Sequence, residues 1–134
     1  MTGPADVKAC CAAAYDSDLV ALLLGDAYHP GGAALTRRLA DRLRLRPGER
    51  VLDVASGPGA TALLLAAEYD VTVEGIDLGA GSVERARAAA DGAGLGHRAC
   101  FRVGDAERLP VDAGSVDAAV CECALCTFPD KPAA

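Results

Sequence analysis

Two aspartates and two glycines have a spacing that is suited to binding the polar groups of a nucleoside. Asp53 ends a short apolar run, and Gly57 and Gly59 follow it directly before a helix-like stretch. Glycine lets the backbone approach a ligand closely, and the N–H groups at the start of a helix face such a ligand. Asp77 lies 20 residues after Gly57, at the end of the next apolar run, where a carboxylate can accept hydrogen bonds from two ribose hydroxyls. Together these residues predict a nucleoside-type cofactor.

Two kinds of nucleoside cofactor compete for this pattern. A dinucleotide-binding loop is written G-x-G-x-x-G, and here Ala55 and Ala60 replace its first and third glycines. The pattern therefore disfavours an NAD-dependent oxidoreductase, which stays as the weaker alternative.

The cysteines are a second group able to do chemistry. Cys121, Cys123 and Cys126 come at the end of the fourth apolar run, and Cys10 and Cys11 lie near the N-terminus. In an extended strand Cys121 and Cys123 point to one face and can converge on a soft ion, whereas adjacent helical cysteines point about 100° apart. Three interpretations remain open: a thiolate site, small apolar side chains that only pack, and a zinc site, which lacks a fourth ligand.

The elements that must position these residues alternate along the chain. We expect strands at 50–54, 71–77, 100–103 and 116–125, and helices at 5–24, 35–46, 60–68 and 82–93, with Ser82 as the N-cap of the last helix and a loop at 28–32. Alternating strands and helices favour a parallel sheet with helical crossovers. The fold class is therefore α/β, a Rossmann-like parallel sheet preceded by two N-terminal helices.

Length and charge restrict the partners. The 134 residues suit one domain, divided into an N-terminal helical segment, 1–46, and a cofactor-binding domain, 47–134. A net charge of -6 argues against nucleic-acid binding, which needs a basic surface. No apolar run is long enough for a membrane span, and the start at Met1 lacks the features of a signal peptide. We expect a cytoplasmic protein with a small-molecule substrate.

The loop motif has a resemblance that favours one cofactor. The run from Asp53 to Gly59 resembles the first motif of class I S-adenosylmethionine-dependent methyltransferases, D/E-x-G-x-G-x-G, with Ala55 departing at the first glycine. The segment 104–110 looks like the adenine-contacting segment of that family. The resemblance implies that S-adenosylmethionine binds with its methionine part at the loop, its ribose at Asp77 and its adenine at Asp105. The cofactor-binding residues are then Asp53, Ala55, Gly57, Gly59, Asp77, Leu78, Asp105 and Ala106.

The last cysteines resemble a more specific family. Segment 123–131, which ends in Pro-Asp-Lys, is similar to the cysteine-bearing segment of arsenite methyltransferases. That resemblance implies that Cys123, with Cys10 or Cys11, holds trivalent arsenic beside the methyl donor as the catalytic thiolates. Cys121 and Cys126 have no counterpart in that family's pattern.

The predicted function is methyl transfer from S-adenosylmethionine to a small molecule, with a thiol-bound metalloid such as arsenite as one acceptor. The alternative is a non-catalytic or truncated domain that binds the cofactor without turnover. Class I methyltransferases carry seven strands ordered 3-2-1-4-5-7-6, and only four are found here. We therefore expect an N-terminal portion, weak or absent activity for these 134 residues alone, and self-association through an exposed fourth strand.

Overall fold

The computed structural model describes residues 3–15, 17 and 31–134. Its helices are α1 (Pro4–Tyr15), α3 (Gly32–Leu43), α4 (Ala60–Glu68) and α5 (Ala80–Gly92), with a short 3-10 helix η1 (Leu125–Thr127). Its strands are β1 (Arg50–Val54), β2 (Thr72–Asp77), β3 (Ala99–Val103) and β4 (Ala118–Val120). The later part of the predicted helix at 5–24 and most of the predicted loop at 28–32 lie outside the described residues.

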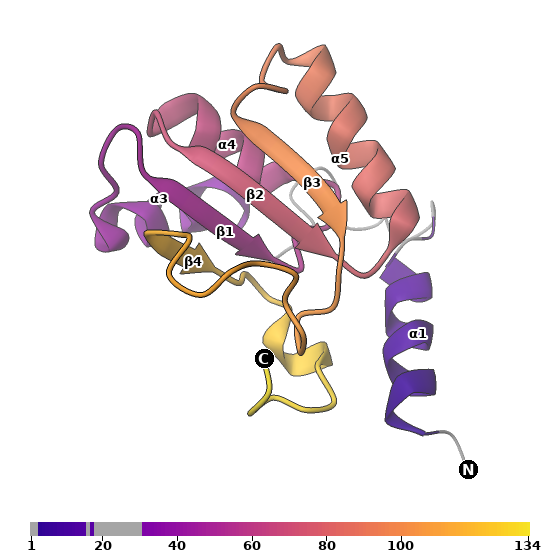
Figure 1. The fold of residues 1–134 in the computed structure, drawn as a ribbon. Helices are drawn as coiled ribbons and strands as arrows, with labels where there is room; N and C mark the ends of the chain where they lie inside the picture. The colour runs from indigo at the N-terminus through magenta and orange to yellow at the C-terminus, as the bar shows by residue number, and fades with distance from the viewer. Residues whose placement is uncertain (1–2, 16, 18–30) are drawn as a thin grey trace.

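The strands form one parallel sheet in the order β3-β2-β1-β4 (Figure 1). Val54 of β1 is level with Ile76 of β2, and Asp77 of β2 is level with Val103 of β3. Because every pairing is parallel, the carboxyl ends of all four strands meet at one edge of the sheet. This arrangement confirms the predicted α/β, Rossmann-like class.

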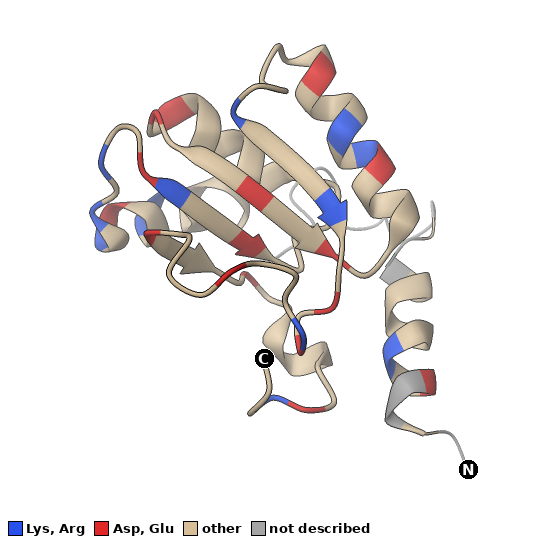
Figure 2. Cartoon of the chain, viewed as in Figure 1, with Lys and Arg blue, Asp and Glu red and all other residues tan. Residues whose placement is uncertain are grey.

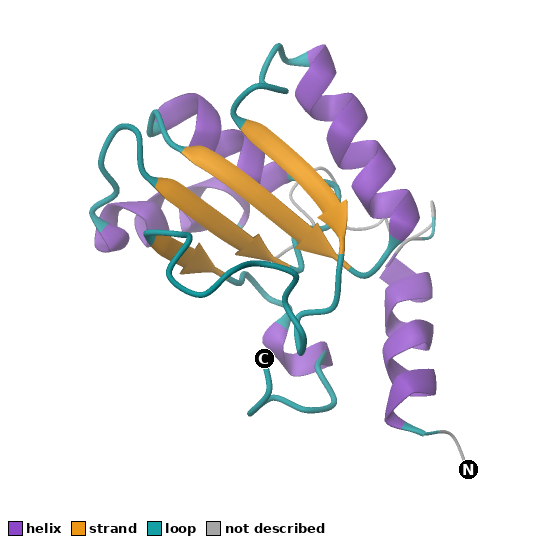
Figure 3. Cartoon of the chain, viewed as in Figure 1, coloured by secondary structure: helices purple, strands orange, loops and turns teal. Residues whose placement is uncertain are grey.

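Helices α4 and α5 lie on the same face of the sheet and contact its strands (Figure 3). Small and branched aliphatic side chains let helix and strand approach closely, and the core consists almost entirely of them. Its largest fully buried members include Leu65, Val51, Val71 and Val83. Ala40 of α3 belongs to the same core, so this helix packs with the sheet domain through α4.

Phe101 is the one phenylalanine in a described strand, and its ring packs against two glycines. A Cβ on Gly75 of β2 would lie 2.4 Å from its ring, and a Cβ on Gly59 would lie 2.8 Å from it. The ring therefore occupies the space that side chains at both glycines would need.

The fourth strand is much shorter than predicted. The sequence favoured 116–125, whereas β4 ends at Val120, the residue paired with Asp53 of β1. Beyond that point β1 turns into its loop and offers no further partner, and Cys123 adopts a left-handed φ of 54°. The prediction that Cys121 and Cys123 share one face of an extended strand is therefore wrong.

The start of α5 was also predicted incorrectly. Gly79 precedes the helix as its N-cap, and Ser82 is buried inside it. The Asp77 carboxylate accepts a hydrogen bond from the N–H of Gly79 at 2.8 Å. This bond forms a local turn, and the helix therefore starts two residues before Ser82.

Within the described residues, no helix has both the length and the apolar character needed to cross a membrane.

Candidate functional site

A cavity of about 140 Å³ lies at the carboxyl edge of the sheet. Segments that follow each of the four strands line it, and α1 forms a further wall through Lys8, Cys11 and Ala12. Of the predicted cofactor residues, those that line the cavity are Asp53, Ala55, Gly57, Asp77, Leu78, Asp105 and Ala106. The predicted motifs therefore lie around one cavity although they are spread from Asp53 to Ala106 along the chain.

The loop after β1 is shaped for close approach to a ligand. Ala55 and Gly57 both have positive φ, 58° and 53°, which explains why glycine is the usual residue at the position of Ala55. A Cβ on Gly57 would meet nothing within 4 Å, so the space beside its backbone is open.

Gly59 lies at the start of α4, where the helix packs on the sheet. It is the N-cap of α4 with a φ of 91°, and it is not among the residues that line the cavity. A Cβ there would lie 2.8 Å from the ring of Phe101 and 3.0 Å from the Cβ of Ala86. Gly59 permits close packing of the helix on the sheet.

Asp77 joins the loops that follow β1 and β2. Its Oδ2 accepts a hydrogen bond from the N–H of Gly57, and its Oδ1 accepts one from the N–H of Gly79, each at 2.8 Å. These bonds hold the carboxylate at the cavity wall in one orientation. A fixed acceptor at the end of β2 suits a ribose.

Asp53 is the most unusual group in the site. It is 2% exposed, and its Oδ2 has no hydrogen-bond partner among the described residues. The pKa of Asp53 is raised to about 8, first by burial away from water and then by the negative charges of Glu122 and Asp77. A buried carboxyl oxygen without a partner at a cavity wall fits a ligand that brings a donor or a positive charge.

The sequence analysis did not identify Glu122, which follows β4 and lines the cavity. The hydroxyl of Thr36 on α3 donates to its Oε2 at 3.1 Å, and the hydroxyl of Thr61 on α4 donates to its Oε1 at 3.4 Å. The only signal in the sequence was its place between two cysteines at the end of a predicted strand.

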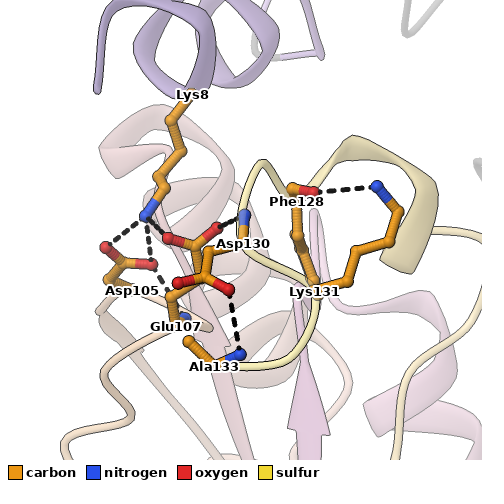
Figure 4. Close-up of polar contacts among 7 residues, drawn as sticks. All are labelled: Lys8, Asp105, Glu107, Phe128, Asp130, Lys131 and Ala133. Atoms are coloured by element: carbon orange, nitrogen blue, oxygen red, sulfur yellow. Dashed lines mark hydrogen bonds and ion pairs between the residues drawn. The ribbon is translucent and has the colours of Figure 1, made fainter. Parts of the chain in front are cut away.

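Asp105 is held by a lysine that the sequence analysis also missed. The Nζ of Lys8 lies 2.8 Å from its Oδ2 and also contacts Glu107 (Figure 4). Glu107 in turn accepts a hydrogen bond from the N–H of Asp130 at 2.7 Å. Lys8 holds the pKa values of both carboxyl groups below their usual range. We call these four residues the Lys8 clamp; it ties α1 to the segments after β3 and η1.

Two of the cysteines line the cavity. Cys11 of α1 and Cys123 line it, whereas Cys10, Cys121 and Cys126 do not. The described residues contain no group of three or more His, Cys, Asp or Glu side chains arranged to hold a metal ion, so the zinc interpretation gains no support.

The charges around the cavity are mostly negative. Figure 2 shows acidic segments at the carboxyl ends of β1 and β2, and Glu122 adds a third carboxylate from the segment after β4. Lys8 is the one lysine or arginine among the described residues that line the cavity, and it contacts the carboxylates of Asp105 and Glu107. The cavity therefore favours ligands with positive charge.

Comparison with known proteins identifies a family and several similar proteins. A family model described as "methyltransferase domain" matches residues 51–134. The 27-O-demethylrifamycin SV methyltransferase of Amycolatopsis mediterranei is 39% identical over 97 residues, which are 72% of this chain and 36% of that protein. The chain thus spans about a third of the length of this relative.

Solved structures agree with the sequence matches. A SAM-dependent methyltransferase from Thiobacillus denitrificans, solved with S-adenosylhomocysteine, has a TM-score of 0.62 and 33% identity, covering 69% of this chain and 37% of that one. The [4+2]-cyclase SpnF has a TM-score of 0.64 and 34% identity, covering 70% of this chain and 35% of that one.

Proposed function

The chain belongs to the methyltransferase domain family, and on that premise we propose that its cavity binds S-adenosylmethionine and that it transfers the methyl group to a small molecule. This membership confirms the resemblance drawn from the loop motif. The dinucleotide alternative is disfavoured on the same ground.

One observation carries the proposal: residues after all four parallel strands converge on one cavity. We assign adenine to Asp105 and Ala106, ribose to Asp77 beside Leu78, and the methionine part to the loop after β1. Asp53 supports this assignment, because its buried Oδ2 lacks a hydrogen-bond partner among the described residues and the methionine part carries an ammonium group. The bound donor supplies a methyl group on a sulfonium, and the residues of this chain supply orientation.

Titration calorimetry of the 134-residue protein with S-adenosylmethionine, S-adenosylhomocysteine and NAD tests the proposal. We expect the first two ligands to bind with one site per chain and NAD to give no heat. Binding of NAD alone would refute it.

A second candidate is cofactor binding without methyl transfer. It is favoured by the similarity to a protein whose name describes a [4+2]-cyclase. Release of S-adenosylhomocysteine in the presence of hydroxyl, amine, thiol and arsenite acceptors separates the two. Binding without release from any acceptor would favour this candidate.

A thiol-bound metalloid such as arsenite is the more specific acceptor proposal. It is supported by Cys11 and Cys123, which line one cavity, and it is weakened because Cys10 is not a lining residue. Trivalent arsenic prefers soft thiolate ligands. We expect Cys123→Ser to abolish arsenite binding, measured by calorimetry, while cofactor binding is kept. Cys100→Ser, at an exposed position on β3, is the matched control, and equal arsenite affinity in Cys123→Ser would exclude the thiolate site.

A further inference from the structure

Lys8 joins helix α1 to the residue that the proposed function assigns to adenine. Its Nζ donates to Oδ2 of Asp105 at 2.8 Å and to Oδ1 at 3.1 Å, and it also donates to Oε2 of Glu107 (Figure 4). An ammonium group has three protons, so these three contacts use all of them. Lys8 therefore lines the cavity without an N–H group left over for a ligand.

The contacts of Asp105 leave one acceptor position on its carboxylate. Oδ1 accepts hydrogen bonds from Lys8 and from the N–H of Glu107, the latter at 2.9 Å, whereas Oδ2 accepts one from Lys8 alone among the described residues. Each carboxylate oxygen has two lone pairs, so Oδ1 is saturated and Oδ2 can accept one more bond. Asp105 lines the cavity with a side chain that is 36% exposed, so a ligand can supply that donor.

We propose that Lys8 is a positioning residue for base recognition: it fixes Asp105 with one open acceptor, so that the cavity selects a base with an exocyclic amino group. The inference rests on the proposed function, in which adenine lies at Asp105 and Ala106. Asp105 contacts the base, and Lys8 acts only through Asp105.

Asp105 does not keep this orientation by itself. Without Lys8, its carboxylate is held only by the N–H of Glu107, and it can turn about that single bond. The carboxylates of Asp105 and Glu107 contact the same Nζ, and their like charges repel each other when no cation lies between them. The carboxylate then turns away from the base, and water takes its place.

A loss of affinity alone does not identify a positioning role, because Lys8 also ties α1 to the cavity wall. The preference between two ligands does identify it. In the 6-deamino analogue of S-adenosylhomocysteine, a hydrogen atom replaces the amino group of the purine, and the rest of the molecule is unchanged. A loosened α1 weakens both ligands equally, whereas a displaced Asp105 weakens only the ligand that has the amino group.

Calorimetry with both ligands on the wild type, Lys8→Met and the control Lys131→Met tests the inference. Lys131 is the other lysine of the chain, and its Nζ donates to the backbone oxygen of Phe128 at 3.1 Å. The wild type binds S-adenosylhomocysteine about tenfold or more tightly than the analogue, and Lys8→Met narrows this preference to within about threefold. Lys131→Met keeps the wild-type preference.

If Lys8→Met fails to fold, Lys8→Gln takes its place. Its neutral amide can donate to one carboxylate but does not offset the charge of both, so it also narrows the preference. An unchanged preference in a folded Lys8 variant, even with weaker binding of both ligands, overturns the inference and leaves Lys8 as a tie for α1. A wild type that binds both ligands equally overturns it as well. Failure of the proposed function is distinct, because then S-adenosylhomocysteine itself does not bind the wild type.

Discussion

Asp77 combines two roles at one carboxylate. It orders the loop through Gly57 and the start of α5 through Gly79, and the same group faces the cavity. We expect Asp77→Ala to keep the fold and to weaken S-adenosylhomocysteine binding by about 1.5 to 3 kcal/mol, the range for a hydrogen bond to a charged group. Calorimetry measures this loss.

The matched control for Asp77 is Asp112→Ala, which removes the same charge from an exposed loop position. It should bind with wild-type affinity. Equal affinity of both variants for S-adenosylhomocysteine would show that Asp77 does not contact the ligand.

Asp53 makes stability depend on pH in an unusual direction. Its pKa of about 8 in the folded protein lies above the ordinary value of 3.8, so the folded state holds the proton more tightly. The Asp53 contribution to stability is therefore fully present below about pH 4 and is lost as the pH rises through 8. We expect the difference in unfolding free energy between Asp53→Asn and the wild type to grow between pH 4 and 9, in favour of the variant.

Urea denaturation at a series of pH values measures this difference for Asp53. Carboxyl groups with lowered pKa values, such as Glu68, shift stability in the opposite direction but contribute equally to both proteins. A difference that does not change with pH would contradict the raised pKa.

The site was only partly predictable at this scale. Asp53, Gly57 and Asp77 could be found because each lies at a fixed distance along the sequence from a strand end. Glu122 and Lys8 could not, since their partners lie 61 to 99 positions away in the chain and only the fold brings them together.

At the scale of elements, the contact of Gly75 in β2 with Phe101 in β3 leaves no room for a larger side chain. A Cβ on Gly75 would lie 2.4 Å from a ring carbon of Phe101, so Gly75→Ala forces the ring or the strand to move. We expect Gly75→Ala to lower the free energy of unfolding by about 1 to 3 kcal/mol, as overpacking usually does. Urea denaturation measures it.

The control for Gly75 is Gly92→Ala at the end of α5, where a Cβ meets nothing within 4 Å. Alanine is the better helix former, so this variant should be as stable as the wild type or slightly more so. Similar losses in both variants would show that the Phe101 contact is not the cause.

The predicted elements were accurate where the pattern was local. Strand β1 and helix α4 have the predicted bounds, because an apolar run and the glycines after it determine both. The end of β4 depends instead on where β1 stops pairing, and the start of α5 depends on the Asp77 turn. Neither contact is visible in the pattern of apolar residues.

For the whole molecule, the described sheet ends in β4 on one side. We predict that the 134-residue protein associates through this strand at high concentration, weakly, because only three residues offer backbone groups. Ala119→Lys, at an exposed position of β4, should reduce the association. The control Ala89→Lys, at an exposed position of α5, should leave it unchanged. Light scattering over a concentration series measures it, and a wild-type mass that stays monomeric throughout would contradict the prediction.

The division at residues 46 and 47, the cytoplasmic location and the small-molecule partner stay predictions. Helix α3 nevertheless contacts the domain at 47–134 in two ways. Ala40 packs in its core, and Thr36 donates a hydrogen bond to Glu122. Such contacts lie between distant parts of the chain, and the sequence pattern gives no sign of them.

We expect the Lys8 clamp to influence how fast a ligand enters and leaves the cavity. Helix α1 forms one wall of the cavity and is tied down by charged groups that remain partly exposed to solvent. Salt screens such pairs, so we expect S-adenosylhomocysteine to dissociate severalfold faster in 0.5 M than in 0.05 M KCl, and Lys8→Met to dissociate rapidly at both concentrations. Stopped-flow displacement measures these rates, and a salt-independent rate in the wild type would contradict the prediction. If the rate rises with salt as expected, ionic strength governs the lifetime of the complex.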